Sequence, residues 1–218
     1  MSDLYDCGQA GPRRRGLAAA ASAVGRGELV VLPTDTVYGI GADAFTAEAV
    51  ASIFSAKRRG RDMPCPVLVG AWQTLDGLVG AVPEQARLLM EAFWPGGLTI
   101  VVRHAPSLSW DLGDARGTVA VRMPLHPVAL ELLASTGPMA VTSANISGQA
   151  PALTAGAAQE QFGTDVSVYL EAGESADQLP SSIVDVTGDA PVLRRAGALS
   201  ADALREVLPE LVEPPAPA

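Results

Sequence analysis

The sequence predicts an α/β domain in which a twisted mixed β-sheet is flanked by helices. Short β-branched runs alternate with alanine-rich or amphipathic stretches along most of the chain, and this alternation is typical of the class. The 218 residues are 48% hydrophobic and 18% charged, which is enough apolar material for one substantial core. We expect a flexible segment over 1–15, a single domain over 16–212, and a disordered tail over 213–218, where EPPAPA cannot pack.

Elements of the first half are marked by β-branched runs, caps, and glycine or proline stops. In chain order they are an alanine-rich helix over 16–27, a buried strand over 28–33, an extended piece after the turn-rich TDTVYG, a helix from the N-cap Thr46 to Lys57, a strand over 66–70, a helix opened by Pro83 and Glu84, and a strand over 98–103. The helix after Thr46 carries an apolar stripe of Val50, Ile53 and Phe54. Lys57 continues this stripe, so we expect it to face the core.

The second half continues the pattern but is looser in its third quarter. In order we expect a strand over 118–123, a helix over 126–136 opened by His126 and Pro127, a strand over 139–143, strand candidates over 166–170, 182–186 and 191–195, and a closing helix over 200–212 with Ser200 as its N-cap. The stretches 147–156 and 173–182 are rich in Pro, Ser and Gly, and we expect loops there. The region 147–182 is a candidate lid.

The charge balance argues against a general affinity for nucleic acid or for anionic membrane surfaces. With 15 basic against 24 acidic residues the net charge is −9, so the mean field repels phosphates. No stretch is apolar over the length of a bilayer span, and the N-terminus lacks the apolar region of a signal peptide. We therefore expect a cytoplasmic protein.

The cysteines and histidines do not suggest a disulfide framework or a metal site. The two cysteines, Cys7 and Cys65, form neither a disulfide framework nor a metal-binding spacing. The two histidines, His104 and His126, are not spaced as a metal pair.

Positive charge is concentrated in one stretch, KRRGR, which puts four cations into residues 57–61. The plainer interpretation is an exposed cationic helix end, and it suits Arg58 and Arg61. It does not suit Lys57, which is the only lysine of the chain and continues the apolar stripe. A compact ammonium on a flexible stem suits a phosphate or carboxylate in a narrow pocket, so we favour an anion site.

Two polar loops follow predicted strands, where ligands commonly bind in open α/β sheets. PTDTVYG over 33–39 offers hydroxyls and a carboxylate, and VTSANISG over 141–148 offers hydroxyls, an amide and backbone N–H groups that suit phosphate oxygens. Taken alone, each loop is better explained as an ordinary turn closed by glycine. The second is not a Walker loop, and no base is visibly arranged beside Ser143 for a serine nucleophile.

Together these segments resemble the YrdC/Sua5 family of threonylcarbamoyl-AMP synthases. The resemblance covers roughly residues 25–200, and the matching stretches are PTDTVYGIGADA, Lys57-x-Arg59, WPGGLTIVV, VAVRMPLHPVALELL, TSANISGQ, SSIVDV and LRRAGAL. It implies a single YrdC-like domain with a concave basic groove. Gly60, Ile183 and the second glycine of WPGG depart from the family's usual proline, threonine and proline, but none of these changes removes a charged group.

The resemblance also implies which residues form the site. Lys57 and Arg59 match the family's Lys-x-Arg signature and are expected to hold carbamate and phosphate oxygens. The residues expected to bind ATP or substrate are Thr34, Thr36, Arg122, Ser143, Asn145, Ser182 and Arg195. Arg194 is the alternative to Arg195, because the double arginine leaves the register open.

The implied reaction joins L-threonine, bicarbonate and ATP to give threonylcarbamoyl-AMP and pyrophosphate. A carbamate and a phosphate, both anionic, must meet, so positioning and fixed positive charge are the expected means of catalysis. Mg²⁺ is expected to arrive with ATP rather than to occupy a protein cage. The product is expected to pass to tRNA threonylcarbamoyl-transferase proteins, without stable direct binding of nucleic acid by this chain.

The main alternative is a binding module whose basic groove holds double-stranded RNA without chemistry. Steep weakening of RNA binding with salt would mark that function. A relative that uses carbamoyl phosphate would carry zinc-finger and acylphosphatase-like regions, for which this chain has neither the length nor the cysteines. An inactive paralogue is disfavoured by the intact Lys-x-Arg and Ser-x-Asn signatures.

Overall fold

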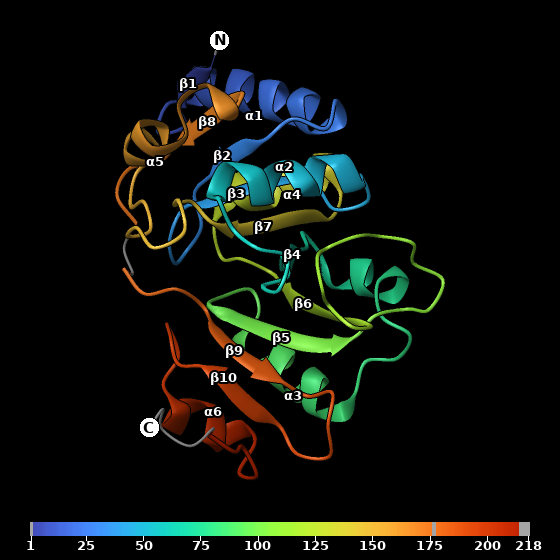
Figure 1. Cartoon of the computed structure of the whole chain (residues 1–218). Helices are drawn as coiled ribbons and strands as arrows, with labels where there is room; N and C mark the ends of the chain where they lie inside the picture. Colours follow the sequence, from blue (N-terminus) through green and yellow to red (C-terminus); the bar gives the residue numbers. More distant parts are fainter. Residues whose placement is uncertain (1, 176–177, 214–218) are drawn as a thin grey trace.

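The computed structural model, which describes residues 2–175 and 178–213, contains one continuous mixed sheet with helices on both of its faces (Figure 1). The order of its described strands is β1-β8-β2-β3-β7-β4-β6-β5-β9-β10. The strands are β1 (Asp3–Asp6), β2 (Val30–Leu32), β3 (Gly39–Asp43), β4 (Val67–Leu68), β5 (Leu98–Arg103), β6 (Thr118–Arg122), β7 (Met139–Ser143), β8 (Val168–Glu171), β9 (Ser182–Asp185) and β10 (Val192–Arg195). The helices are α1 (Ala10–Gly25), α2 (Ala47–Lys57), α3 (Glu84–Phe93), α4 (Pro127–Thr136), α5 (Ala155–Phe162) and α6 (Ala201–Val207), with 3-10 turns η1 (Trp72–Gly77) and η2 (Gly163–Asp165). The predicted fold class is confirmed.

Neighbouring strands pair in both senses, and the pairing brings the two predicted polar loops together. β1, β8 and β2 run parallel, as do β4 with β6 and β5 with β9, whereas the other neighbours are antiparallel. In the antiparallel pair of β3 and β7, Gly39 lies opposite Ser143. The PTDTVYG and VTSANISG segments are therefore adjacent in space although they are far apart in the sequence.

Side chains alternate between two cores because successive residues of a strand face opposite sides of the sheet. Val31 of β2 belongs to one core, whereas Val30 and Leu32 belong to the other. The first core includes residues of α2, α3, α5 and α6, and the second includes residues of α1 and α4. No described residue of β5, β6, β9 or β10 belongs to the second core, so α1 and α4 leave that part of the face uncovered.

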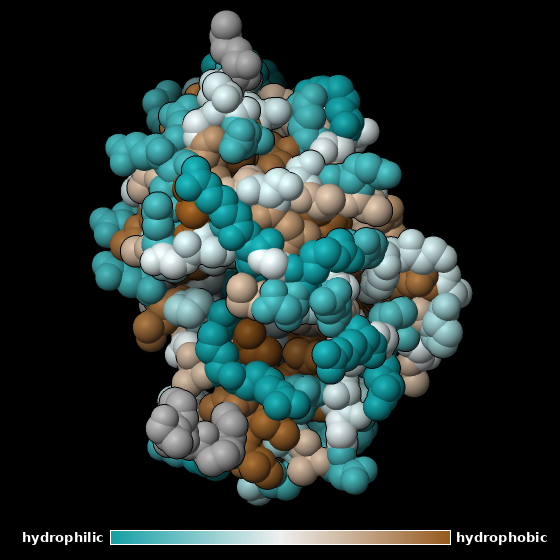
Figure 2. All heavy atoms as spheres, in the orientation of Figure 1, coloured by the Kyte–Doolittle hydropathy of each residue, from teal (hydrophilic) through white to brown (hydrophobic). Residues whose placement is uncertain are grey.

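The molecular surface is hydrophilic over most of the side seen in Figure 2. Hydrophobic residues are visible mainly in the lower half of that view, where β5 and β9 lie (Figures 1 and 2). Among the described residues, no helix combines the length and the apolar character needed to cross a membrane.

The prediction of a flexible segment over 1–15 is wrong for residues 3–15. Residues 3–6 form β1, which pairs in parallel with β8 and places Asp3 opposite Val168. Helix α1 begins at Ala10 rather than near residue 16, because Pro12 lies in its first turn, where a missing N–H costs nothing. The expected tail over 213–218 lies outside the described residues from 214 on.

Two further expectations need correction, both in the second half. The stretch 147–156 was expected to be a loop, but its last residues open α5, and the Thr154 side chain accepts a hydrogen bond from the Ala157 N–H at the N-cap. The closing helix α6 ends at Val207 instead of running to 212, because Pro209 disfavours the helical conformation of the residue before it. The remaining predicted strands and helices are present, with ends that shift by a few residues.

Candidate active site

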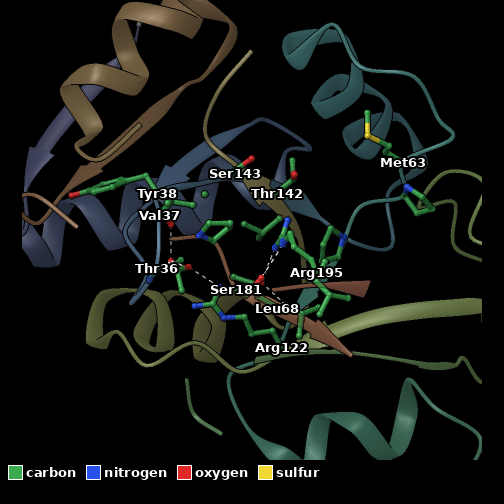
Figure 3. Close-up of a pocket in the computed structure, with 18 of the residues that line it drawn as sticks. Thr36, Val37, Tyr38, Met63, Leu68, Arg122, Thr142, Ser143, Ser181 and Arg195 are labelled. Carbon is green, nitrogen blue, oxygen red and sulfur yellow. Dashed lines mark hydrogen bonds between the residues drawn. The ribbon is translucent and has the colours of Figure 1, made fainter. Parts of the chain in front are cut away.

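A pocket of about 310 Å³ opens on the part of the sheet that α1 and α4 leave uncovered (Figure 3). Its walls come from the β2–β3 connection, the segment after α2, and the strands from β7 across the sheet to β10. Three arginines line it, Arg59, Arg122 and Arg195, and none of the described lining residues is a carboxylate, a lysine or a histidine. This arginine pocket is therefore a local positive site in a chain of net charge −9.

Six of the nine predicted site residues line the arginine pocket. They are Thr34, Thr36, Arg59, Arg122, Ser143 and Arg195. The other three, Lys57, Asn145 and Ser182, do not line it, and they are only 2%, 8% and 0% exposed. The sequence therefore identified the region of the site, but not which of its polar residues face the cavity.

The β2–β3 connection is held by a buried hydrogen-bond network around Arg122. The Thr34 hydroxyl donates to the carbonyl oxygen of Val37 at 2.7 Å and accepts from the Thr36 N–H at 3.2 Å. Arg122 donates to the Thr36 hydroxyl at 2.8 Å (Figure 3). It also donates to the Asp35 carboxylate at 2.7 Å. Burial lowers the pKa of Arg122, and the charge of Asp35 opposes that shift. Arg122 is thus fixed in place as a permanent cation at the base of the turn.

Arg59 crosses from the end of α2 to β7 and organises the loop between them. Its guanidinium donates to the Thr142 hydroxyl at 2.9 Å and to the carbonyl oxygens of Met63 and Pro64, each at 3.0 Å. It also lies 5.7 Å from the centre of the Phe54 ring, a distance at which the ring face attracts a cation. Burial lowers the pKa of Arg59. Arg59 therefore shapes one wall of the pocket as well as charging it.

Lys57 ends α2 in a buried position, as its place in the apolar stripe predicted, and its ammonium is bound to backbone. Nζ donates to the carbonyl oxygen of Ser143 at 2.5 Å and to that of Asn145 at 2.6 Å. The Ser147 N–H donates in return to the Lys57 carbonyl oxygen at 2.9 Å. Burial, and then the nearby charge of Arg59, lower the pKa of Lys57 to about 8. Lys57 therefore fastens the loop that carries Ser143 at the pocket wall.

The two other buried site residues also stabilise loops. The Asn145 amide donates to the carbonyl oxygens of Ile146 and Gln149, at 3.0 and 2.9 Å. The Ser182 hydroxyl donates to the Leu199 carbonyl oxygen at 2.7 Å and accepts the N–H groups of Gly197 and Leu199, each at 3.0 Å. Every one of these contacts lies within the protein, so both side chains support the segments that border the pocket.

Arg194 and Arg195 lie beside a register shift between β9 and β10 and have different surroundings. The shift lies between Leu193 and Arg195. Arg195 lines the pocket and donates to the carbonyl oxygen of Ser181 at 2.9 Å and to its hydroxyl at 3.0 Å (Figure 3). Arg194 instead pairs with Asp185 at 2.9 Å, and 57% of its side chain is exposed. Of the two arginines, Arg195 is therefore the one that lines the pocket.

Four polar residues that line the pocket were not predicted: Tyr38, Thr99, Thr142 and Ser181. Thr142 and Ser181 are immediate neighbours of the predicted residues Ser143 and Ser182. The polar stretches therefore pointed to these positions, but not to which of the adjacent side chains faces the cavity. Tyr38 gave no such signal. Its hydroxyl donates to Glu171 at 2.9 Å, a residue 133 positions away, and burial raises its pKa.

The chain is similar to one family of known proteins. The family model of the Sua5, YciO and YrdC proteins, described as "Telomere recombination", matches residues 22–197. A Mycobacterium tuberculosis homologue is 57% identical over 208 residues, which are 95% of this chain and 96% of its own. The threonylcarbamoyl-AMP synthase of Pyrococcus abyssi is 37% identical over 193 residues, which are 88% of this chain but 57% of its own.

Solved structures show the same likeness in three dimensions. P. abyssi Sua5 complexed with L-threonine superposes with a TM-score of 0.90 at 32% identity, over 99% of this chain and 63% of that protein. Escherichia coli YciO, at 23% identity and a TM-score of 0.81, has the same fold. From the family match and these identities, the chain belongs to the Sua5/YciO/YrdC family.

Proposed function

We propose that this protein makes threonylcarbamoyl-AMP and pyrophosphate from L-threonine, bicarbonate and ATP, for the N6-threonylcarbamoyladenosine modification of tRNA. Membership of the family supports this activity, as do the name of the P. abyssi relative and the L-threonine bound in its structure. We place the protein in the cytoplasm and expect it to hand its product to tRNA threonylcarbamoyl-transferase proteins.

The observation that carries the proposal is the charge of the arginine pocket. In the proposed reaction a carbamate oxygen attacks the α-phosphate of ATP while pyrophosphate leaves, so two anions must be held in contact. Fixed cations in a small cavity relieve this repulsion and orient the groups before they react. The arginine pocket is suited to holding two anions, because three arginines line it and none of its described lining residues is a carboxylate.

Arg195 is the arginine best prepared to bind a phosphate. A guanidinium has five N–H groups, and for Arg195 only two hydrogen bonds to described residues occur, both to Ser181. Arg122 donates from all three of its nitrogens, to Gly96, Thr36 and Asp35. We therefore assign Arg195 to the phosphates. Arg122 would act as a fixed charge beside the amino acid.

Lys57 has a different proposed role from the one its sequence motif suggested. Its ammonium already donates to the carbonyl oxygens of Ser143 and Asn145, and the residue does not line the pocket. We propose that Lys57 positions the loop carrying Ser143. Arg59, which does line the pocket, would supply the direct contact of the Lys-x-Arg signature to the substrates.

Mg²⁺ is proposed to enter with ATP. Among the residues that the structure describes, no three His, Cys, Asp or Glu side chains are grouped as a metal site would need. The described lining of the pocket offers hydroxyls rather than carboxylates, which suits a metal held mainly by phosphate oxygens and water. When bound, the metal would shield the charge of the departing pyrophosphate.

The alternative of a double-stranded RNA module is less well supported. The three arginines are concentrated in a pocket of about 310 Å³, whereas a duplex needs cations spread along an open surface. The discriminating experiment measures pyrophosphate release from ATP and bicarbonate, with and without L-threonine. We expect release only with threonine, and steeply salt-dependent RNA binding without such release would favour the alternative.

A further inference from the structure

A second pocket, of about 320 Å³, lies against the first, because Thr34 and Tyr38 line both. Its charged or titratable lining residues include Asp35, His126 and Glu174, and no lysine or arginine is among the described residues that line it. We call it the acidic side pocket. Two cavities of opposite electrostatic character thus share one wall.

The acidic side pocket holds two buried polar atoms that have no partner. Among the described residues, the only buried side-chain nitrogen or oxygen atoms without a hydrogen bond are Nδ1 of His126 and Oγ of Ser175, and both residues line this pocket. Leaving such an atom unpaired in a buried place is unfavourable, so both atoms are available to a polar group that enters the cavity. At about 30 Å³ per molecule the cavity has room for several waters.

The proposed reaction needs a proton acceptor that the arginine pocket does not offer. Threonine enters as an ammonium, which must lose one proton before its nitrogen can bond to carbon. The described lining of the arginine pocket contains no carboxylate, histidine or lysine, and burial raises the pKa of Tyr38. The nearby arginines favour the neutral amine through repulsion, but a guanidinium is already protonated and cannot take the proton.

We propose that the acidic side pocket is the exit route for this proton and that His126 is its acceptor, an inference that rests on the proposed function. An N–H bond of the ammonium breaks, and the proton passes along water to Nδ1 of His126. The freed lone pair forms a C–N bond to the carbon of bicarbonate and the C–OH bond of bicarbonate breaks. The hydroxyl takes a second N–H proton and leaves as water, which gives the carbamate. His126, which is half-buried as a residue, then releases the proton to solvent.

The surroundings of His126 suit a relay. Burial lowers its pKa, while the charge of Asp35 opposes this shift and that of Arg13 adds to it, so the ring is neutral near pH 7 and free to accept. The charged groups that act on it are Asp35 from the β2–β3 connection and Arg13 from α1, and Glu174 from the segment after β8 lines the same pocket. Arg13 is itself paired with Glu131 of α4 at 2.6 Å. The charge of Asp35 stabilises the imidazolium while it exists, and the lowered pKa of His126 favours release of the proton.

The test compares His126→Asn with His104→Asn, since the chain has only these two histidines. Asparagine suits the N-cap position of α4 that His126 occupies, but it does not titrate. At about pH 7 we expect kcat for threonine-dependent pyrophosphate release to fall about tenfold in His126→Asn. At about pH 9.5, where most free α-amine is already neutral, kcat should return to within about twofold of wild type.

Two controls separate a relay from a structural role. Added imidazole should restore part of the lost rate of His126→Asn near neutral pH, and His104→Asn should follow wild type at every pH. If the ratio of the His126→Asn kcat to the wild-type kcat does not change with pH, or if the kcat of His126→Asn equals that of wild type, the relay is wrong. The proposed function would still stand in either case. Pyrophosphate release by the wild type that does not require threonine would instead overturn the proposed function, and the inference with it.

Discussion

The ammonium of Lys57 lies 2.5 Å from the carbonyl oxygen of Ser143, so the end of α2 and the end of β7 are joined directly. A second bond to Asn145 at 2.6 Å, and the return bond from the Ser147 N–H at 2.9 Å, make this a three-point attachment. The attachment sets where the Ser143 side chain meets the arginine pocket. A buried lysine is thus bonded to a loop of the arginine pocket, which it does not itself line.

Replacing Lys57 by alanine should therefore abolish activity by displacing the loop. We expect turnover to fall at least about 100-fold, which is what a misplacement of about 1 Å can cost. Lys57→Arg should also be poor, because a planar fork cannot replace a compact ammonium in this space. The matched control is Arg58→Asn, which removes the neighbouring exposed charge at a residue with φ of 51°, where Asn is tolerated. Near-normal pyrophosphate release by Lys57→Ala would contradict this role.

The depressed pKa of Lys57 predicts a pH dependence of stability. Its pKa is about 8 in the folded protein against an ordinary value of 10.5, so the unfolded chain binds this proton more tightly. The free energy of unfolding should therefore rise with pH between about 8 and 10.5, by at most on the order of 3 kcal/mol. Urea unfolding at about pH 7.5 and 9.5 tests this against Lys57→Met, which lacks the titration. Parallel pH profiles for the two proteins would show that Lys57 keeps an ordinary pKa.

The two adjacent arginines of β10 offer a matched pair of variants. Arg195→Ala should raise the KM for ATP by about tenfold or more, because a charge-assisted hydrogen bond to phosphate is lost. Arg194→Ala removes the same charge from an exposed side chain that pairs with Asp185 outside the pocket and should change the KM by less than about twofold. Steady-state kinetics of pyrophosphate release give both values. Equal effects of the two substitutions would mean that Arg195 acts only through net charge.

Gly39 allows a packing test at the pocket wall. A Cβ atom on Gly39 would lie 2.5 Å from Cγ1 of Val141 on the neighbouring strand, which is too close for real atoms. Gly39→Ala should cost about 1–3 kcal/mol of stability. In a Val141→Ala background the clash is removed, so the cost should fall by about half or more. If Gly39→Ala lowers stability equally in the wild-type and Val141→Ala backgrounds, contact with Val141 is not the cause of the destabilisation.

The sequence predicted those parts of the fold that local patterns specify. The strands over 98–103 and 139–143 agree with β5 and β7 at both ends, because each is a β-branched run with clear stops. Strand β1 was missed because DLYD is short and charged at both ends, and its partner β8 lies more than 160 positions later. Helix α5 was missed because AGAAQEQF has a weak apolar face and follows a stretch that contains Pro151 and Gly148.

The sequence predicted where the candidate site lies, but only partly which of its side chains face the cavity. Lys57 was expected to be buried because it continues an apolar stripe, and it is 2% exposed. That its ammonium would bind two backbone carbonyls depends on the pairing of β3 with β7, which no local pattern specifies. Likewise, the register shift beside Arg195 breaks the strict alternation of β10, so counting residues could not separate it from Arg194.

The most direct test of the central claim, that the arginine pocket holds both substrates, is a crystal structure with L-threonine and a non-hydrolysable ATP analogue. We predict phosphate oxygens within hydrogen-bond distance of the Arg195 guanidinium and the amino acid beside Arg122 and Thr34. A nucleotide bound away from this pocket, with Arg195 still bonded only to Ser181, would contradict the account.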